Sequence, residues 1–541
     1  MAWGRISVQF EWGCMRLDAA RRRASRLSPV LGLLLPGVLL AGCAVGPDFV
    51  PPDPGLPQTS FLATAAREPT DRTAATSASF AAPNPDWWGI FRDHELIALE
   101  DRVAAANLDV QTATLRLAQS RFQRDVAAAA QFPGLNGNAS YERQKPSDNG
   151  LLGLFSQGFS GNSANGAFGN QPGGIPGNLT APFSLWQYGF DASWELDIWG
   201  KVRRQVESAD AQAEAAEEQR RAVLVSSLAE VARDYMRLRG IQMQIKIARE
   251  NVATSADILK VTHERQDRGL VTGLDVETAA AQVESVRAQL PDLQRQQSEA
   301  INSLSLLLGQ PPGDLAAELI SPGALPPAPP RLPVGIPSDL ARRRPDIRQA
   351  EAQLHAATAD MGVAIGEFYP SVSLNGSVGF QALDLKNLWK GTSLQYAMGP
   401  NITLPIFEGG RLKAQLAMRT AQQKEAAVAY HEAVLKAWHD VVNALVAYRT
   451  ERERHARLVS QTEHARAALN LARDRYNQGV AQFITVLDAE RTLLQAEQDA
   501  ATSATNVAVD LVALYKALGG GWESTFPDAP PATLARLDAP H

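Results

Sequence analysis

The chain repeats itself, and this duplication limits the folds open to it more than any other feature. From Leu108 onward the sequence aligns without a gap with the sequence from Pro345 onward. A second alignment relates Gly269 to Gly479, 210 positions later. The repeated unit of roughly 200 residues is longer than the periods of solenoid repeats, so we interpret each copy as a duplicated half-domain.

Each unit contains two stretches in which apolar and polar residues alternate. The clearest is "SLWQYGFDASWELDIWGK" (184–201), where Trp186 and Trp194 belong to one apolar series and three acids belong to the polar series. A period of two residues predicts a β-strand with one apolar and one polar face. The other three predicted strands begin at Leu135, Val372 and Leu394. Residues 145–183, rich in Gly, Asn and Ser, predict a long exposed loop, and 383–393 a shorter one.

The rest of each unit reads as helix. Between Gly410 and Gly479 there is neither Gly nor Pro, and between Lys201 and Arg268 only Gly240 intervenes. A helix of this length extends about 100 Å at 1.5 Å per residue. That is about three times the ~30 Å core of a bilayer, and these segments are too polar to lie in lipid.

Shorter helices are predicted in pairs that add up to the length of a long helix. The pairs are near 94–130 with 275–308, and near 338–367 with 485–518. We therefore expect each long helix to lie beside two short ones stacked end to end. Pro291 should kink or break its helix, because proline lacks the backbone N–H that a helix interior needs.

Composition and motif content argue against several classes of function. The net charge is −6, so nothing suggests a surface for nucleic acid. His431 and His439 do not form a HExxH pair, and the "GGG" at 519–521 follows a helix and reads as its end. Asp488 and Glu490 are not a credible acid/base pair without a pocket. We expect no enzyme, no metal site and no bound cofactor.

The N-terminus reads as an export signal, assigned to residues 1–42. "RLDAARRRASRL" supplies the positive region and "SPVLGLLLPGVLLAG" the short apolar region, and translation from Met15 would retain both. "LAGC", ending at Cys43, resembles the bacterial lipobox, which predicts a diacylglycerol and an acyl chain on Cys43. The alternative is an ordinary cleavage site with an incidental cysteine. Ala44 is not the aspartate associated with retention in the inner membrane, so the expected destination is the outer membrane.

Four strands cannot close a membrane barrel, because known barrels begin at eight strands and open edges are not tolerated in hydrocarbon. If the apolar faces meet lipid, two chains would supply eight strands and three would supply twelve. The span from Trp186 to Trp194 is about 26 Å at 3.3 Å per residue. This is close to the ~25 Å apolar band between the aromatic girdles of such barrels, so we assign both tryptophans to a lipid-facing girdle. The alternative is a soluble β-sandwich with the aromatic residues in its core.

Several segments together resemble the TolC-type outer-membrane efflux channel family, in particular its lipoprotein (NodT-like) branch. They are "CAVGPDFVPP" (43–52), "DWWGIFRDHEL" (86–96), "LDIWGKVRR" (196–204), "LPVGIPSDLARRRPDIRQAE" (332–351), "LPIFEGGRLKAQ" (404–415), "RYNQGVAQFITVLDAERTLLQAE" (475–497) and "LYKALGGGW" (514–522). The resemblance implies a mainly α fold with a transmembrane β part: a homotrimer with a 12-strand β-barrel continued by a periplasmic α-helical barrel. It also implies a periplasmic adaptor and an inner-membrane pump, often of the resistance-nodulation-division type.

The same resemblance locates a gate at the tip farthest from the membrane. It puts Ile484 and Asp488 where the family narrows its entrance with apolar and acidic rings. It puts Tyr476 and Asp275 where a hydrogen bond links neighbouring helix pairs. Ala481 stands where some members carry a second locking arginine, so the lock is expected to be weaker. The local sequence allows a different role, because Thr485-x-x-Asp488 is also a capping box and Asp275 a good N-cap.

These observations divide the chain into six expected segments: a signal peptide (1–42), a lipid-anchored segment (43–91), a first repeat (92–309), a Pro-rich connector (310–337), a second repeat (338–521) and a tail (522–541). The predicted function is the exit duct of a tripartite efflux system in the outer membrane. A type I secretion duct, or a lipid-anchored periplasmic coiled-coil scaffold without a pore, remains an alternative.

Overall fold

The computed structural model describes residues 44–56, 78–79, 86–147, 149, 182–327, 332–333 and 340–523. The predicted signal peptide, Cys43, most of the 145–183 loop, part of the Pro-rich connector and nearly all of the tail lie outside these residues. The elements below belong to the unit that begins at Ala44.

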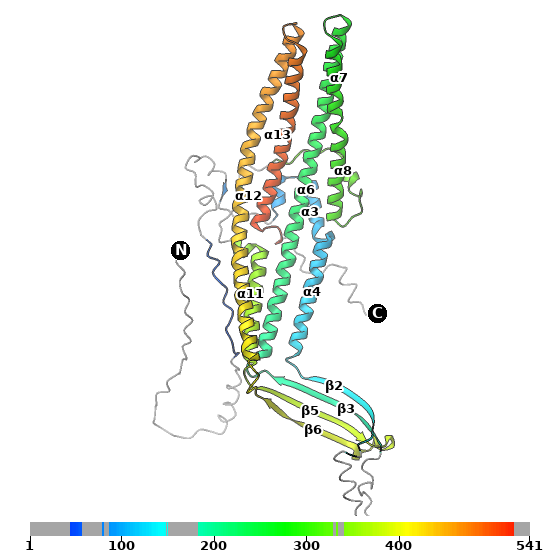
Figure 1. Ribbon diagram of the computed structural model, residues 1–541, viewed down its shortest axis with the longest axis vertical. Helices are drawn as coiled ribbons and strands as arrows, with labels where there is room; N and C mark the ends of the chain where they lie inside the picture. Colours follow the sequence, from blue (N-terminus) through cyan, green and yellow to red (C-terminus); the bar gives the residue numbers. More distant parts are fainter. Residues whose placement is uncertain are drawn as a thin grey trace, which may run out of the picture. The chain divides into compact units, whose positions relative to one another are not determined.

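The four predicted strands are confirmed and form one antiparallel sheet (Figure 1). Its strands are β2 (Gly134–Gln144), β3 (Phe183–Leu196), β5 (Ser371–Ala382) and β6 (Leu394–Thr403), in the order β2-β3-β5-β6. Among the described residues, β2 and β6 each have a neighbour on one side only, so both edges of the sheet are open. A separate parallel pair joins β1 (Ala78–Ser79) to β4 (Leu332–Pro333).

The register of the sheet places the apolar series of all four strands on one face. Trp186 lies opposite Tyr141, and Phe190 lies between Gly137 and Val378. Val378 in turn lies opposite Tyr396 of β6. Because facing residues in a ladder share a side, the sheet has one continuous apolar face and one polar face.

Two helices of 67 residues each confirm the long helical segments: α6 (Lys201–Asp267) and α12 (Arg411–Asn477). Each follows a glycine with positive φ, Gly200 (80°) or Gly410 (89°). Each ends at a turn that contains another, Gly269 (71°) or Gly479 (75°). L-residues with a side chain rarely adopt this conformation, so the four glycines set both ends of the long helices. None of the described helices is apolar over enough residues to cross a bilayer.

The shorter helices stack beside the long ones as expected (Figure 1). Helices α4 (Leu108–Ala129), α8 (Gln289–Leu307) and α7 (Gly273–Arg287) lie along α6. Helices α11 (Pro345–Gly366) and α13 (Phe483–Leu518) lie along α12, and both also pack against α6. The predicted break at Pro291 is confirmed, since the helix is interrupted at Ala288 and Pro291 lies in the first turn of α8.

The predicted helix near 94–130 is in fact two helices, α3 (His94–Ala106) and α4. They meet at Asn107, whose side chain accepts hydrogen bonds from the backbone N–H groups of Asp109 (2.9 Å) and Val110 (3.1 Å). Such side-chain bonds compete with a continuous helix and favour a new N-terminus. The remaining short elements are the helices α9 (Ala316–Leu319) and α10 (Leu340–Arg343) and the 3-10 turns η3 (Trp87–Phe91), η5 (Leu385–Asn387) and η6 (Gly391–Ser393).

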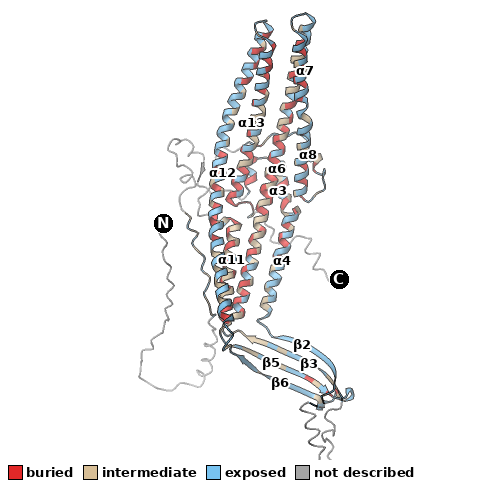
Figure 2. Ribbon diagram, viewed as in Figure 1, coloured by how far each residue is buried: buried red, intermediate tan, exposed pale blue. Residues whose placement is uncertain are grey.

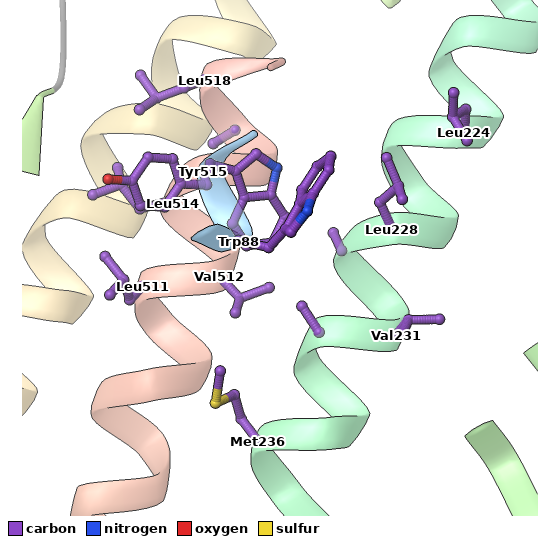
Figure 3. Close-up of a cluster of buried hydrophobic side chains, with 14 of the residues drawn as sticks. Trp88, Leu224, Leu228, Val231, Met236, Leu511, Val512, Leu514, Tyr515 and Leu518 are labelled. Carbon is purple, nitrogen blue, oxygen red and sulfur yellow. The ribbon is translucent and has the colours of Figure 1, made fainter. Parts of the chain in front are cut away.

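The largest buried cluster lies partway along the helices, where η3 and α3 meet α6 and α13 (Figures 2 and 3). Trp87 stacks on Tyr515 with ring centroids 5.5 Å apart, and Trp88 meets Trp87 edge to face. Farther along α6, a Cβ on Gly240 would lie 2.1 Å from Thr505 Oγ1 of α13. Glycine at this position therefore allows the close approach of the two helices.

Glu100 of α3 is fully buried, and neither carboxylate oxygen has a hydrogen-bond partner among the described residues. Burial, aided by the charge of Asp101, holds the pKa of Glu100 well above its ordinary value. As the pH rises above that ordinary value, the unfolded chain gains a charge that the folded chain resists. The free energy of unfolding therefore falls at this site as the pH rises, because the unfolded chain ionises Glu100 more readily than the folded chain does.

We expect Glu100→Met to stabilise the protein by about 1–3 kcal/mol at pH 8, because at that pH folding must either protonate Glu100 or bury its charge without a partner. The gain should shrink toward pH 4, where Glu100 is protonated in both states. Thermal unfolding at both pH values measures it, and Asp125→Met, which replaces an exposed acid of α4, is the control. A gain independent of pH would contradict this account of Glu100.

Candidate functional site

The two predicted girdle residues lie toward opposite ends of the apolar face of β3. The ring of Trp186 is 4.3 Å, centroid to centroid, from that of Tyr141. Trp194 donates from Nε1 to the carbonyl of Gln131 (2.9 Å), just after α4. Phe190 between them is 55% exposed. Trp194 thus lies near the junction of sheet and helices, as an interfacial residue should, whereas its contact with lipid stays a prediction.

The three acids of this strand's polar series have different roles. Asp191 accepts a hydrogen bond from the amide of Asn138 and lies on the polar face of the sheet. Glu195 pairs with Lys201 at 2.7 Å. Asp197 accepts from the backbone N–H groups of Val202 and Arg203, each at 2.9 Å, and so stabilises the first turn of α6. Of the three, only Asp191 makes no contact at the junction between β3 and α6.

The segment that follows Cys43 is bound along the helices, which the sequence did not indicate. We call residues 44–56 the N-terminal strap; it is the dark blue trace in Figure 1. Val45 donates its N–H to the carbonyl of Trp199 (3.0 Å), next to α6. Buried Arg204 pairs with Asp48 at 2.6 Å, and Phe49 stacks on His355 at 4.4 Å. The strap therefore holds Ala44 where the sheet meets the helices.

The two hairpin turns lie at the ends of α6 and α12 farthest from the sheet (Figure 1). Asp275 accepts hydrogen bonds from the backbone N–H (3.0 Å) and Oγ1 (2.9 Å) of Thr272. Because α7 starts at Gly273, Thr272 is the N-cap and Asp275 is the third residue of the helix. The assignment of Asp275 as N-cap was therefore wrong, although its carboxylate does stabilise the helix start.

The capping box assigned to Thr485 and Asp488 was also wrong. Helix α13 starts at Phe483, with Gln482 at the N-cap, so Thr485 is already the third helical residue. Asp488 lies in the second turn, too far along to reach the free N–H groups of the helix start.

Ile484 and Asp488 form an exposed pair on α13. They are four residues apart, which places them on one side of the helix, and Ile484 is 50% exposed. The carboxylate of Asp488 bonds to none of the described residues. Their neighbours Phe483, Val486 and Leu487 pack inward against α12. The pair is thus available to line a constriction, and that role stays a prediction.

Tyr476 is buried at the end of α12, and its hydroxyl has no partner among the described residues. Arg265 of α6 lies over its ring, 4.2 Å from the centroid. The same guanidinium donates to the carbonyls of Tyr476 (2.9 Å) and Asn477 (3.0 Å). We call this set the Arg265 clamp. It ties the end of α6 to the end of α12, and its only sequence signal was a basic residue just before the helix end.

The structure does not join Tyr476 to Asp275 within one chain, so their contact stays a prediction. If it forms in the closed channel, Tyr476→Phe should raise single-channel conductance in planar bilayers, because it removes only the hydroxyl and keeps the ring under Arg265. Thermal stability should change little, since that hydroxyl has no partner to lose. Unchanged conductance would rule out a hydrogen bond from Tyr476 in the closed channel and leave this residue with a packing role only.

Comparison with known proteins places the chain among channels. The family model described as outer membrane efflux protein matches residues 99–310 and 336–520. The pyoverdine export outer membrane protein OpmQ of Pseudomonas aeruginosa is 32% identical over 91% of this chain and 97% of its own length. The toluene efflux pump outer membrane protein TtgC of Pseudomonas putida is 31% identical over 91% and 96%. The solved outer-membrane channel OprN is similar with a TM-score of 0.75, at 35% identity over 89% of this chain and 100% of that one.

Proposed function

Because the chain belongs to the outer membrane efflux protein family, we propose that three copies of it close one β-barrel and one α-helical barrel around a shared conduit. As a member of this family the chain is an outer-membrane efflux channel, and its helical part extends into the periplasm. The number of copies is our inference from the family resemblance, because the sheet alone would also allow a dimer with eight strands. Four strands per chain give twelve in a trimer, within the range of closed membrane barrels.

The observation that carries the shared barrel is the open-edged sheet with one continuous apolar face. Its edge strands β2 and β6 offer unpaired backbone groups, and hydrocarbon does not tolerate such groups. Pairing β6 of one copy with β2 of the next satisfies both edges. The aromatic and aliphatic face then meets lipid, and the face with Asp191 and Asn138 meets water.

We propose that a periplasmic adaptor protein and an inner-membrane pump, of the resistance-nodulation-division type, deliver small molecules to the tip. The names of TtgC and OpmQ, with toluene and pyoverdine, support export of small molecules but do not define the cargo of this chain. The conduit is passive. No reaction is assigned to the chain, because it belongs to a family of channels.

We further propose that Ile484 and Asp488 narrow the periplasmic entrance. Three copies would place three Asp488 carboxylates around one axis, where they attract cations and repel one another. The exposure of both side chains on one side of α13 supports this role.

Planar-bilayer recording on the purified protein tests the proposed channel. We expect discrete conductance steps from a preparation that migrates as a heat-sensitive trimer on gels. A stable oligomer that never conducts would favour a lipid-anchored scaffold without a pore, and a monomer would refute the shared barrel.

The lipid on Cys43 is part of this proposal, and the N-terminal strap supports it because Ala44 is held where the sheet meets the helices. An acyl chain buries its CH₂ groups in the bilayer at roughly 0.8 kcal/mol each. We expect Cys43→Ser to abolish labelling with radioactive palmitate and to lower the yield of trimer several-fold. Trimers that do form should conduct normally, because the barrel itself crosses the membrane. Intact mass showing an unmodified wild-type N-terminus would reject the anchor.

A further inference from the structure

Arg475 lies one residue before Tyr476, and its backbone carbonyl accepts from Val480 (2.9 Å) in the turn, yet its side chain takes no part in the contacts at the tip. It is exposed, and its guanidinium makes no hydrogen bond or ion pair with a described residue. One turn earlier, Leu471 is 64% exposed on the same side of α12. An exposed cation next to an exposed apolar side chain, both near a helix end, is typical of a surface that binds a partner.

The duplication of the chain indicates which residues could be the partner of Arg475. At the distance of 210 residues that relates Gly269 to Gly479, Arg475 corresponds to Arg265. The acceptors of the Arg265 clamp also have counterparts, since Asn477 corresponds to Asp267. Asp267 is exposed at the last position of α6, and its carboxylate likewise has no partner among the described residues.

Within one chain, α6 lies against the α12–α13 hairpin. Its residues Ile258 and Val261 line one small cavity of about 130 Å³ with Tyr476 and Val486. The repeat relates α6 to α12 and α7 to α13. In a closed ring, the α12–α13 hairpin has its own α6 on one side and the α6–α7 hairpin of the next copy on the other. Repeating the internal contact places the end of that neighbouring α6 beside Arg475.

We propose that Arg475 of one copy binds the C-terminal end of α6 in the next copy, where it donates to the carbonyl of Gln266 and to the carboxylate of Asp267. The inference rests on the proposed trimer and names a residue pair that joins its tips. The carbonyl of Gln266 already accepts from the N–H of Gly269 (2.8 Å), as the carbonyl of Tyr476 does from Gly479 (3.0 Å), but a carbonyl oxygen has a second lone pair for an arginine. The end of a helix also carries a partial negative charge, which an arginine fork matches. Leu471, the counterpart of Val261, would then pack against the same α6 of the next copy, one turn from Arg475.

The two clamps differ in chemistry. Inside the chain, Arg265 has a neutral amide and an aromatic ring as partners. Between chains, Arg475 has a carboxylate in place of the amide, and Gln266 in place of the ring. The contact between copies is therefore an exposed ion pair, which salt weakens, whereas the clamp inside the chain is partly shielded.

Chemical crosslinking between copies tests the pair directly. Arg475→Cys and Asp267→Cys are carried on separate, differently tagged chains that are coexpressed and treated with a short bismaleimide in membranes. A disulfide is unsuitable, because an extended arginine keeps the two backbones farther apart than a disulfide spans. We expect a crosslinked band that carries both tags, because the crosslink requires only that the two positions lie close together in neighbouring copies.

Asn470→Cys paired with Asp267→Cys is the matched control, because Asn470 is exposed on a different side of α12. The wild-type chain, treated alike, controls for its own two cysteines. Equal yields from the test and control pairs, in a preparation that migrates as a trimer, would overturn the clamp between copies. A wild-type protein that forms no trimer would instead overturn the proposed function.

Discussion

Phe190→Arg is expected to prevent assembly of the trimer almost completely. Phe190 lies mid-way along the apolar face of β3, between Gly137 and Val378, and is 55% exposed in the single chain. An arginine facing lipid at the midplane of a barrel costs roughly 2–4 kcal/mol, and each trimer would carry three. The measurement is the fraction of heat-sensitive trimer in outer-membrane extracts.

Ser377→Arg is the matched control for this variant. Ser377 lies one residue from Val378 on β5 and opposite Asp191, so its side chain belongs to the polar face. The same charge there should face the lumen and leave the yield of trimer nearly unchanged. Trp194→Arg should fall between the two, because Trp194 is bonded to Gln131 near the junction with the helices, where the cost is about 0–1 kcal/mol. Equal loss for Phe190→Arg and Ser377→Arg would reject the assigned faces.

Asp488→Ala is expected to raise single-channel conductance and to weaken cation selectivity, with a change of roughly twofold or more in conductance. The smaller side chain widens the proposed constriction in all three copies, and three carboxylates no longer attract cations. Because Asp488 is not a cap, the thermal stability of the trimer should stay within error. A helix cap would instead cost about 1 kcal/mol on removal.

Asp275→Ala provides the contrasting control for Asp488→Ala. Asp275 bonds to Thr272 in a capping box, so its removal should lower stability through the start of α7. A rise in conductance for Asp488→Ala without loss of stability, beside a loss of stability for Asp275→Ala, would separate the two acids. If Asp488→Ala lowers the thermal stability and leaves the conductance unchanged, Asp488 does not form part of the gate.

The sequence by itself determined the four strands of the sheet, the two long helices and their order, although it did not show that Asn107 divides 94–130 into two helices. Strict alternation from Trp186 to Trp194 specifies a two-faced strand, because successive side chains of a strand point to opposite sides. The long runs, in which Gly240 is the single Gly or Pro, specify helices that end at Gly269 and Gly479. The summed lengths of the shorter helices then indicated that each long helix has two short partners. These signals are local or periodic, so they are readable without knowing which segments meet.

Only the tertiary structure decided the roles of individual polar side chains. Asp197 stabilises the start of α6, and Arg265 donates to the carbonyl of Tyr476, which lies 211 residues later in the chain. The strap is held by Arg204 and His355, which lie far along the chain from Asp48 and Phe49. Whether an acid caps a helix depends on the residue at which the helix starts, and Thr485 and Asp488 satisfy the spacing of a capping box at the wrong place. Asp197 contacts the helix that directly follows it, but the other pairings join segments far apart in the chain that come together only after packing, so no local pattern encodes them.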